Sequence, residues 1–378
     1  MSRQDDIDKK GAKKHKNRWW LIAFVIEIIV IIIIVVLFVN EYISSRIGMI
    51  EHKELDETIV NNEIDEATVK KMTEGYKTIA LFGIDTRSAD MEEEGVRSDT
   101  IILCCINNDT KQVKLVSIYR DTYLELVNDY QSYEKATHAY AYGGPQGAVN
   151  MLNKNLDLNI SEYVSVNFTA LTEAIDALGG LDIELKSSEL DKLNQCIDEQ
   201  MRINGIQSNY VYETGVVHLD GVQATAYARI RSTDQGDITR TWRQRLVIQK
   251  MIEAAKSAGL SKLMDCIDVV VGDISSSLSK DEIIELAKDC FDYEIATTTG
   301  FPFTYTSPTL EGKGSVIVAA DLETNVIALH RFLYDDMDYV PTQTVKDISA
   351  KVVSDSGTYN TLDLTTFQVE DDVDSIVQ

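Results

Sequence analysis

The residues from Trp19 to Val39 most constrain how this chain can fold. They read WWLIAFVIEIIVIIIIVVLFV, and Glu27 is the one charged residue among these 21. A helix needs about 20 apolar residues to cross the hydrocarbon core of a bilayer. The run is too long for the apolar part of a signal peptide, and no small-residue cleavage site follows it. The sequence therefore predicts one uncleaved N-terminal transmembrane helix over residues 19–39.

The charges on either side of this run predict its orientation. Residues 1–18 hold 7 Lys and Arg and 3 Asp, whereas Glu41, Glu51 and Glu54 follow the run. Basic segments stay in the cytoplasm. We therefore expect a cytoplasmic tail over 1–18 and a single-pass protein of the cell membrane whose remainder is extracellular. Without the tail and Glu27, that remainder has 29 basic and 57 acidic residues, a net charge of −28. This charge opposes nucleic-acid binding.

The rest of the chain divides by composition. Residues 40–75 are polar with weak periodicity and are interpreted as an extracellular stem. A folded domain is expected over 76–350, and an acidic, flexible tail over 351–378. The five cysteines show no metal-ligand spacing, and Cys104 and Cys105 lie in an apolar run that predicts burial.

Strand and helix patterns alternate through the domain. Strands are predicted at 77–85, 98–106, 111–118, 162–168 and 181–185, and helices from Gly143 to about 155 and at 169–180, 243–258 and 280–291. The turn at 107–110 makes a hairpin of 99–118, and 187–215 is interpreted as a polar insertion. This order predicts an α/β fold with α-β-α layers around a mixed, largely antiparallel sheet.

Several charged residues fall at predicted strand ends. Asp85 ends the first strand, Arg97 and Asp99 open the second, and Arg120 and Asp121 follow the third. If the hairpin forms, these side chains meet at one edge of the sheet. Carboxylates beside arginines suit a divalent cation with a bound phosphate. Taken singly, each would more often be a surface ion pair or a turn cap.

The segment from Arg229 to Arg245 holds five arginines in an acidic protein. Arginine binds phosphate through two parallel hydrogen bonds. Arg229 and Arg231 alternate as at a strand end, so we expect them to face phosphates. Arg243 and Arg245 open a helix and are expected to be half solvated, with Gln244 pointing inward.

A second polar group precedes the Gly143-Gly144-Pro145 helix start. It contains Lys135 and His138, and a helix N-terminus attracts anions. Tyr140 and Tyr142 are expected to pack in the core. The sequence has no Ser-His-Asp elbow, HExxH, Walker loop or GxGxxG, which disfavours serine hydrolases, zinc peptidases and NTPases.

Six segments resemble, in the same order, the LytR-CpsA-Psr family. They are LFGIDTR, VRSDTIIL, VKLVSIYRDTYLEL, KATHAYAYGG, ALGGLDIEL and HLDGVQATAYARIRSTDQGDITRTWRQR. The resemblance covers about residues 76–260. It implies an enzyme that moves an anionic glycopolymer, of the wall teichoic acid or capsular polysaccharide type, from a polyprenyl-pyrophosphate carrier to peptidoglycan.

The resemblance also implies roles for individual residues. Asp85 and Asp99 would hold Mg²⁺, or Mn²⁺ in its place. The catalytic set would be Asp99, Arg120, Asp121, Arg229 and Arg231, and the pyrophosphate-binding set Arg97, Arg120, Lys135, Arg229, Arg231, Arg240 and Gln244. Lys135 fits the family pattern less closely. Two alternatives share the same site: a hydrolase of the lipid pyrophosphate, and a binding module without turnover.

Overall fold

The computed structural model describes residues 41–42, 45–46, 48–84, 95–128, 131–231, 237–289, 291–319 and 321–367. The chain divides into two compact units, Met1–Met49 and Ile50–Gln378. None of the described helices is long and apolar enough to cross a membrane. The tail and span predicted over 1–18 and 19–39 lie outside the described residues.

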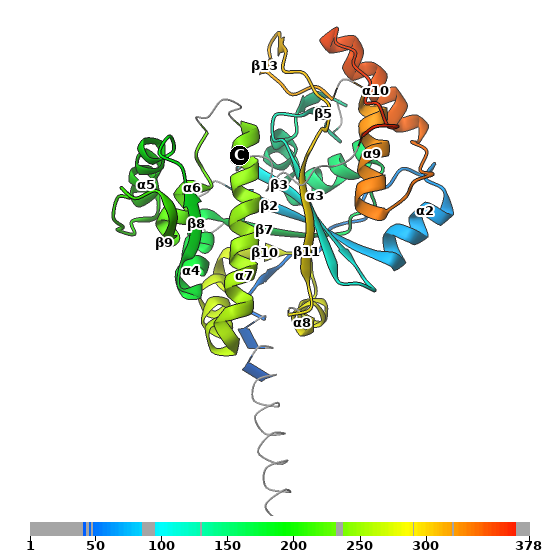
Figure 1. Ribbon diagram of the computed structural model, residues 1–378. Helices are drawn as coiled ribbons and strands as arrows, with labels where there is room; N and C mark the ends of the chain where they lie inside the picture. Colours follow the sequence, from blue (N-terminus) through cyan, green and yellow to red (C-terminus); the bar gives the residue numbers. More distant parts are fainter. Residues whose placement is uncertain are drawn as a thin grey trace, which may run out of the picture. The chain divides into compact units, whose positions relative to one another are not determined.

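Seven strands form the main sheet of the second unit, in the order β1-β10-β7-β2-β3-β4-β11 (Figure 1). Their bounds are β1 Glu51–His52, β2 Tyr76–Ile84, β3 Ser98–Asn107, β4 Gln112–Ile118, β7 Glu162–Asn167, β10 Ile274–Ser276 and β11 Glu294–Phe301. The expected hairpin is present, because β3 and β4 pair antiparallel through Ile102 and Ser117.

The predicted mixed sheet is confirmed, but the prediction that it is largely antiparallel is wrong. Three neighbouring pairs of the described strands are antiparallel, namely β10–β7, β2–β3 and β3–β4. Three are parallel, namely β1–β10, β7–β2 and β4–β11. Parallel neighbours are joined by long crossovers, so local patterning does not reveal which strand returns beside which.

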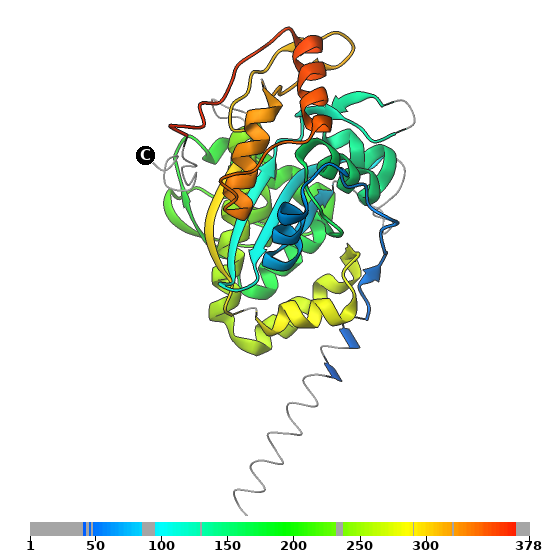
Figure 2. The ribbon, with the colours of Figure 1, turned by 90° about the vertical axis from the view of Figure 1, so that its right-hand side faces the viewer.

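Helices cover both faces of the sheet, which confirms the α-β-α layering. On one face lie α3 Thr137–Leu156 and α9 Leu322–Tyr334, with α10 Gln343–Ser356 packed on them (Figure 2). On the other lie α4 Phe168–Leu178, α7 Asp237–Val270 and α8 Lys280–Lys288. Successive residues of a strand point to opposite faces of the sheet, so the strands contribute to two hydrophobic cores. Phe82 and Leu103 pack toward α3 and α9, and Ile79 and Ile102 pack on the opposite face.

A lateral lobe stands where the sequence predicted a polar insertion. It contains β8 Leu181–Leu185, α5 Leu190–Asn204, β9 Gly215–Leu219 and α6 Gly221–Tyr227. Leu193 and Ile197 of α5 are fully buried in its core. The insertion is therefore a folded part of the domain. Two further ribbons pair β5 Tyr123–Glu125 with β6 Tyr133–Lys135, and β12 Thr309–Leu310 with β13 Gly314–Ser315.

Both ends of this unit extend past the boundaries drawn from composition. It begins at Ile50, and β1, α2 Glu66–Lys70 and the π-helix η1 Lys71–Gly75 precede Tyr76. Met72 is buried in the core. At the other end α10 continues to Ser356, and Leu362 beyond it is buried. Residues 368–378 of the predicted tail lie outside the described part of the chain.

Candidate functional site

Asp99 and Arg120 meet at one edge of the sheet, as the predicted hairpin requires. β3 begins beside the end of β4, and Arg120 Nη1 donates to Asp99 Oδ1 at 2.7 Å. β2 ends at the same edge, because Ile84 pairs with Ser98. Asp85 follows Ile84 directly in sequence but lies outside the described residues. The edge therefore gathers the ends of three strands.

Two further arginines converge on Asp99. Arg231 Nη2 donates to Asp99 Oδ2 at 3.2 Å, and Arg240 Nη2 donates to the Asp99 carbonyl oxygen at 3.0 Å. Burial alone would raise the pKa of Asp99, but the charges of Arg120, Arg240 and Arg231 outweigh it and hold that pKa below its usual range. Asp99 is therefore an ionised carboxylate that fixes guanidinium groups from two distant segments.

The network continues beyond Arg120. Asp121 lies 3.9 Å from Arg120 Nε, and Lys135 Nζ lies 3.1 Å from Asp121 Oδ1. These three side chains are about one-fifth exposed. Arg231, Asp99, Arg120, Asp121 and Lys135 thus form one chain of ion pairs, here called the ion-pair chain, with its Arg231 end half exposed. An anion entering at Arg231 would meet donors that are already positioned.

Arg229 lies on a different wall. Its Nη1 donates to Gln200 Oε1 of α5 at 2.7 Å, and its guanidinium lies over the Phe168 ring at 5.1 Å. The expected strand end at Arg229 is wrong: α6 ends at Tyr227, and the Arg229 amide donates to the Ala226 carbonyl in a turn. A helix of only seven residues does not show a periodicity distinct from that of a short strand.

The expectation that Arg243 and Arg245 are half solvated is also wrong. Their exposed fractions are 2% and 1%. Arg243 donates to Glu189 Oε1 from Nε at 3.1 Å and Nη2 at 2.8 Å, and to the Ile230 carbonyl at 3.1 Å. The lateral lobe covers this face of α7, which patterning of α7 alone does not reveal. Gln244 does point inward, and its Oε1 has no hydrogen-bond partner among the described residues.

The arginines surround a polar cavity of about 370 Å³. Four of its lining residues come from α5, which the sequence did not single out. The full lining is Asp99, Phe168, Lys192, Gln195, Cys196, Glu199, Arg229, Arg231, Arg240 and Gln244. Of the predicted residues, Asp99, Arg229, Arg231, Arg240 and Gln244 are thus brought together around this cavity, and Arg120 is bonded to Asp99. The cavity is called the phosphate pocket here, after the ligand that the sequence predicts for these arginines.

An apolar groove of about 450 Å³ adjoins the phosphate pocket. It lies between the sheet and helices α4 and α7, and Phe168 and Gln244 line both cavities. Apolar lining residues include Leu81, Ile102, Val164, Leu171, Ala174, Val247, Ile248, Met251, Ala255, Cys266 and Val270. Gly83 and Thr100 also line the groove, and a Cβ at position 83 would lie only 2.8 Å from Thr100 Cβ, so no larger residue fits there without a shift of Thr100. The combined shape suits a charged head with an apolar chain.

Arg97 and Lys135 lie near the start of α3. Lys135 joins the ion-pair chain, whereas Arg97 is exposed and does not line the phosphate pocket. α3 starts at Thr137, before the predicted Gly143, and its backbone breaks at Gly144. Tyr140 is buried as expected, but Tyr142 is 68% exposed, so its predicted core position is wrong.

The described residues supply only part of a metal site. Among them no group of three His, Cys, Asp or Glu could hold an ion. Asp99 is ionised, as a Mg²⁺ ligand must be, but both its oxygens are bound by arginines. Asp85 and phosphate oxygens would have to complete the coordination. The described donor set alone does not fit a cation.

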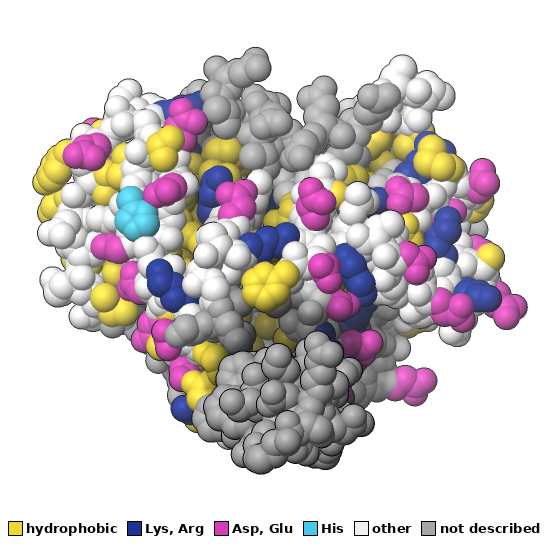
Figure 3. Space-filling model, turned by 60° about the horizontal axis from the view of Figure 1, so that its bottom comes forward, with side chains coloured by type: hydrophobic (Ala, Val, Ile, Leu, Met, Phe, Trp, Pro, Cys, Tyr) yellow, Lys and Arg dark blue, Asp and Glu magenta, His cyan; other side chains and the backbone are white. Residues whose placement is uncertain are grey.

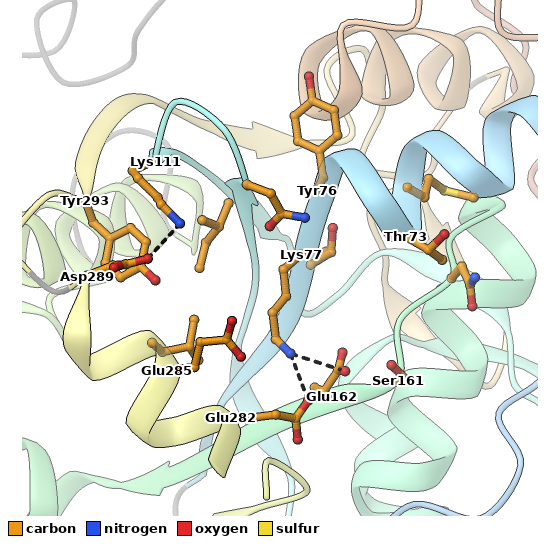
Figure 4. Close-up of a pocket in the computed structure, with 16 residues that line it drawn as sticks. Thr73, Tyr76, Lys77, Lys111, Ser161, Glu162, Glu282, Glu285, Asp289 and Tyr293 are labelled. Atoms are coloured by element: carbon orange, nitrogen blue, oxygen red, sulfur yellow. Dashed lines mark hydrogen bonds and ion pairs between the residues drawn. The ribbon is translucent and has the colours of Figure 1, made fainter. Parts of the chain in front are cut away.

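A separate polar cavity of about 580 Å³ lies at the opposite end of β2 (Figure 4). Its cations are paired: Lys77 Nζ lies 3.0 Å from Glu282 and 3.5 Å from Glu162, and Lys111 Nζ lies 2.7 Å from Asp289. Burial would raise the pKa of Glu282, but hydrogen bonds from Ser279 and Lys77 lower it to about 2. These pairs fasten α8 to the sheet and leave no cation free for a phosphate.

Comparison with known proteins identifies the class that this fold and site define. Residues 43–325 match the LytR_cpsA_psr family, so the chain belongs to the LytR-CpsA-Psr family. Over 278 residues it is 30% identical to the polyisoprenyl-teichoic acid–peptidoglycan teichoic acid transferase TagU of Bacillus mycoides, spanning 73% of this chain and 84% of that protein.

Solved structures share the fold. Protein gbs0355 from Streptococcus agalactiae superposes with a TM-score of 0.61 at 23% identity, covering 72% of this chain and 92% of that one. A structure of TagT bound to LI-WTA superposes with a TM-score of 0.52 at 23% identity, covering 80% and 100%. The match to the family model, not these distant structures, confirms the family resemblance seen in the sequence.

Proposed function

We propose that this protein transfers an anionic glycopolymer of the wall teichoic acid type from a polyprenyl-pyrophosphate carrier to peptidoglycan. One observation carries the proposal: the phosphate pocket adjoins the apolar groove, and Phe168 and Gln244 line both. A pyrophosphate beside Arg229, Arg231 and Arg240 would leave its polyprenyl chain in that groove. The activity named for the TagU relative supports the same reaction.

The reaction needs no nucleotide, because the pyrophosphate bond is cleaved in the transfer. A hydroxyl oxygen of the acceptor sugar forms a bond to the phosphorus that carries the polymer. The bond from that phosphorus to the bridging oxygen breaks, and polyprenyl phosphate leaves with the electron pair. Arg231, Arg229 and Arg240 stabilise the negative charge that develops on the phosphate oxygens.

The hydroxyl proton goes to a carboxylate, and Asp121 is the better candidate. Asp99 is a weak base because its pKa is lowered and arginines bind both its oxygens. Its role is to position Arg120 and Arg231. Asp121 is part exposed and contacts Lys135, which can offset the charge change.

Mg²⁺, or Mn²⁺, remains part of the proposal, with Asp85 and Asp99 as its protein ligands. When bound, the ion would neutralise charge on the phosphate oxygens. We expect chelation to lower turnover and added Mg²⁺ to restore it, and an activity indifferent to both would remove the metal from the proposal.

The proposed location is the outer face of the cell membrane, through the span predicted over 19–39. Nucleic acid is a poor alternative partner. On the face in Figure 3, acidic and basic side chains are interspersed instead of gathered into one basic surface.

Arg231→Ala tests the function. Loss of one transition-state donor costs on the order of 10²–10³ in kcat, measured as transfer of lipid-linked polymer to peptidoglycan oligomers. Arg202→Ala, on the exposed surface of α5, is the matched control and should retain activity. Release of free polymer without acceptor would indicate a hydrolase, and lipid binding without any product would indicate a binding module. Full transfer by Arg231→Ala would refute the assignment.

A further inference from the structure

An exposed aromatic ring stands on α3, the helix that begins two residues after Lys135 of the ion-pair chain. Tyr142 is 68% exposed, and its ring centroid lies 5.8 Å from that of His138, one turn earlier on α3. Exposing a tyrosine ring leaves apolar area in water that burial would remove. The proposed binding of the lipid pyrophosphate does not use this ring.

α3 is fastened directly to the reacting edge of the sheet. The Thr137 amide donates to the Arg120 carbonyl at 2.9 Å, and Thr137 Oγ1 donates to the Ser98 carbonyl at 2.9 Å. The start of the helix is therefore bonded to Arg120 itself and to Ser98, the neighbour of Asp99. At about 1.5 Å per residue, Tyr142 lies roughly 8 Å along the helix from Thr137.

Arg97 adds a cation to the same surface. The Gly95 amide donates to the Ala141 carbonyl at 3.3 Å, so the segment leading to Arg97 runs along the first turns of α3. Arg97 is exposed, and burial together with its charge lowers the pKa of His138. Glu134 Oε2 lies 3.3 Å from His138 Nδ1, and both side chains are mostly buried. The surface thus presents the Arg97 guanidinium, the edge of the His138 imidazole beside Glu134, and the Tyr142 phenol ring, here called the α3 platform.

The reaction geometry assigns a side to each substrate. In an in-line displacement the attacking oxygen approaches opposite the leaving oxygen. The leaving polyprenyl phosphate would lie toward Phe168 and Gln244, where the phosphate pocket meets the groove. Helices α4 and α5 lie on one side of the sheet edge, and α3 lies on the other (Figure 1). The acceptor hydroxyl would therefore arrive over α3.

We propose that the α3 platform, formed by Arg97, His138 and Tyr142, binds the peptidoglycan glycan strand that accepts the polymer. The inference rests on the proposed function and adds the acceptor subsite to it. The apolar face of a sugar ring packs on an aromatic ring, and the carboxylates of the peptide stems pair with the guanidinium. Because α3 follows Lys135, which lies 3.1 Å from Asp121, an acceptor held on this helix would direct its hydroxyl toward Asp121.

Tyr142→Ala in the full-length protein tests the inference. We expect the KM for soluble peptidoglycan strands to rise about fivefold, because an aromatic contact contributes about 1 kcal/mol. The KM for the lipid-linked donor should stay unchanged. Tyr142→Phe, which keeps the ring, should behave as the unaltered protein. Tyr359→Ala removes a tyrosine that is 70% exposed beyond α10 and should leave both constants unchanged.

Direct retention of the unaltered protein on peptidoglycan strands separates this inference from the proposed function. Binding of the unaltered protein to the strands that is lost in Tyr142→Ala would support the platform, even if no transfer were detected. In that case only the proposed transfer reaction would be refuted. An unchanged acceptor KM in Tyr142→Ala would overturn the platform while transfer stood. A Tyr142→Phe variant as impaired as Tyr142→Ala would also overturn it, since the ring would not be the binding element.

Discussion

Glu189→Gln should destabilise the protein by about 3 kcal/mol, because it leaves Arg243 without its counter-charge. The two side chains are 6% and 2% exposed, and Arg243 donates twice to one Glu189 oxygen. Removing one partner of a buried ion pair typically costs 3–5 kcal/mol. We expect the lower end of this range because Arg243 would still donate to the Ile230 carbonyl at 3.1 Å and lie over the Tyr227 ring at 5.6 Å.

Thermal unfolding of the full-length protein in detergent measures this cost. At roughly 2 °C per kcal/mol for a large domain, Tm should fall by about 6 °C. Because Glu189 begins α5, whose residues line the phosphate pocket, the affinity for the lipid pyrophosphate should fall as well.

A double-mutant cycle isolates the pair. Combining Glu189→Leu with Arg243→Met replaces two buried charges by apolar groups and should recover most of the lost stability. Lys250→Gln on the same helix breaks an exposed ion pair with Glu253 and should change stability by less than about 0.5 kcal/mol. The reasoning fails if Glu189→Gln lowers Tm no more than Lys250→Gln does. It also fails if the double variant loses as much stability as the two single substitutions lose together.

The remaining predictions concern the site. Asp99→Asn should lower kcat about 100-fold with a smaller change in donor KM, because Arg120 and Arg231 lose the carboxylate that positions them; equal kcat values would contradict this role. Because the pKa of Asp99 is lower in the folded protein than its unfolded value of about 3.9, ionised Asp99 should stabilise the fold fully at any pH above 3.9. This contribution to stability should be lost only as the pH falls through the lower pKa of the folded state. A ¹³C titration of the Asp99 carboxyl group with a midpoint at or above about pH 3.9 would disprove this. Ala255→Trp should weaken binding of long polyprenyl chains while sparing water-soluble short-chain donors, and equal loss for both would show that the groove is not the lipid site.

The sequence predicts the layers and the reacting edge because both depend on local patterns. The turn after Asn107 forces β3 and β4 into a hairpin, so Asp99 and Arg120 must meet. The parallel pairing of β11 with β4 depends on a return over some 175 residues, and no local signal encodes it.

The walls of the site were harder to predict. Leu193 and Ile197 alternate with charges on α5, and that amphipathic spacing was the available signal for a helix inside the polar insertion. The burial of Arg243 follows from the packing of α5, not from its own segment. The exposure of Tyr142 depends on the break at Gly144, which ends the first part of α3 at the surface.

The two cavities of the site each contain a native thiol, which makes them accessible to chemical probes without added cysteines. Cys196 lines the phosphate pocket and Cys266 the apolar groove. Burial raises the pKa of both thiols, so neither is readily ionised near neutral pH, and labelling should accelerate with pH. A charged reagent would reach Cys196 and an apolar one Cys266. If donor lipid protects Cys196 from labelling, its pyrophosphate head occupies the phosphate pocket, and if it protects Cys266, its polyprenyl chain occupies the groove. An electrophile attached to a lipid-like chain could then bond covalently to Cys266.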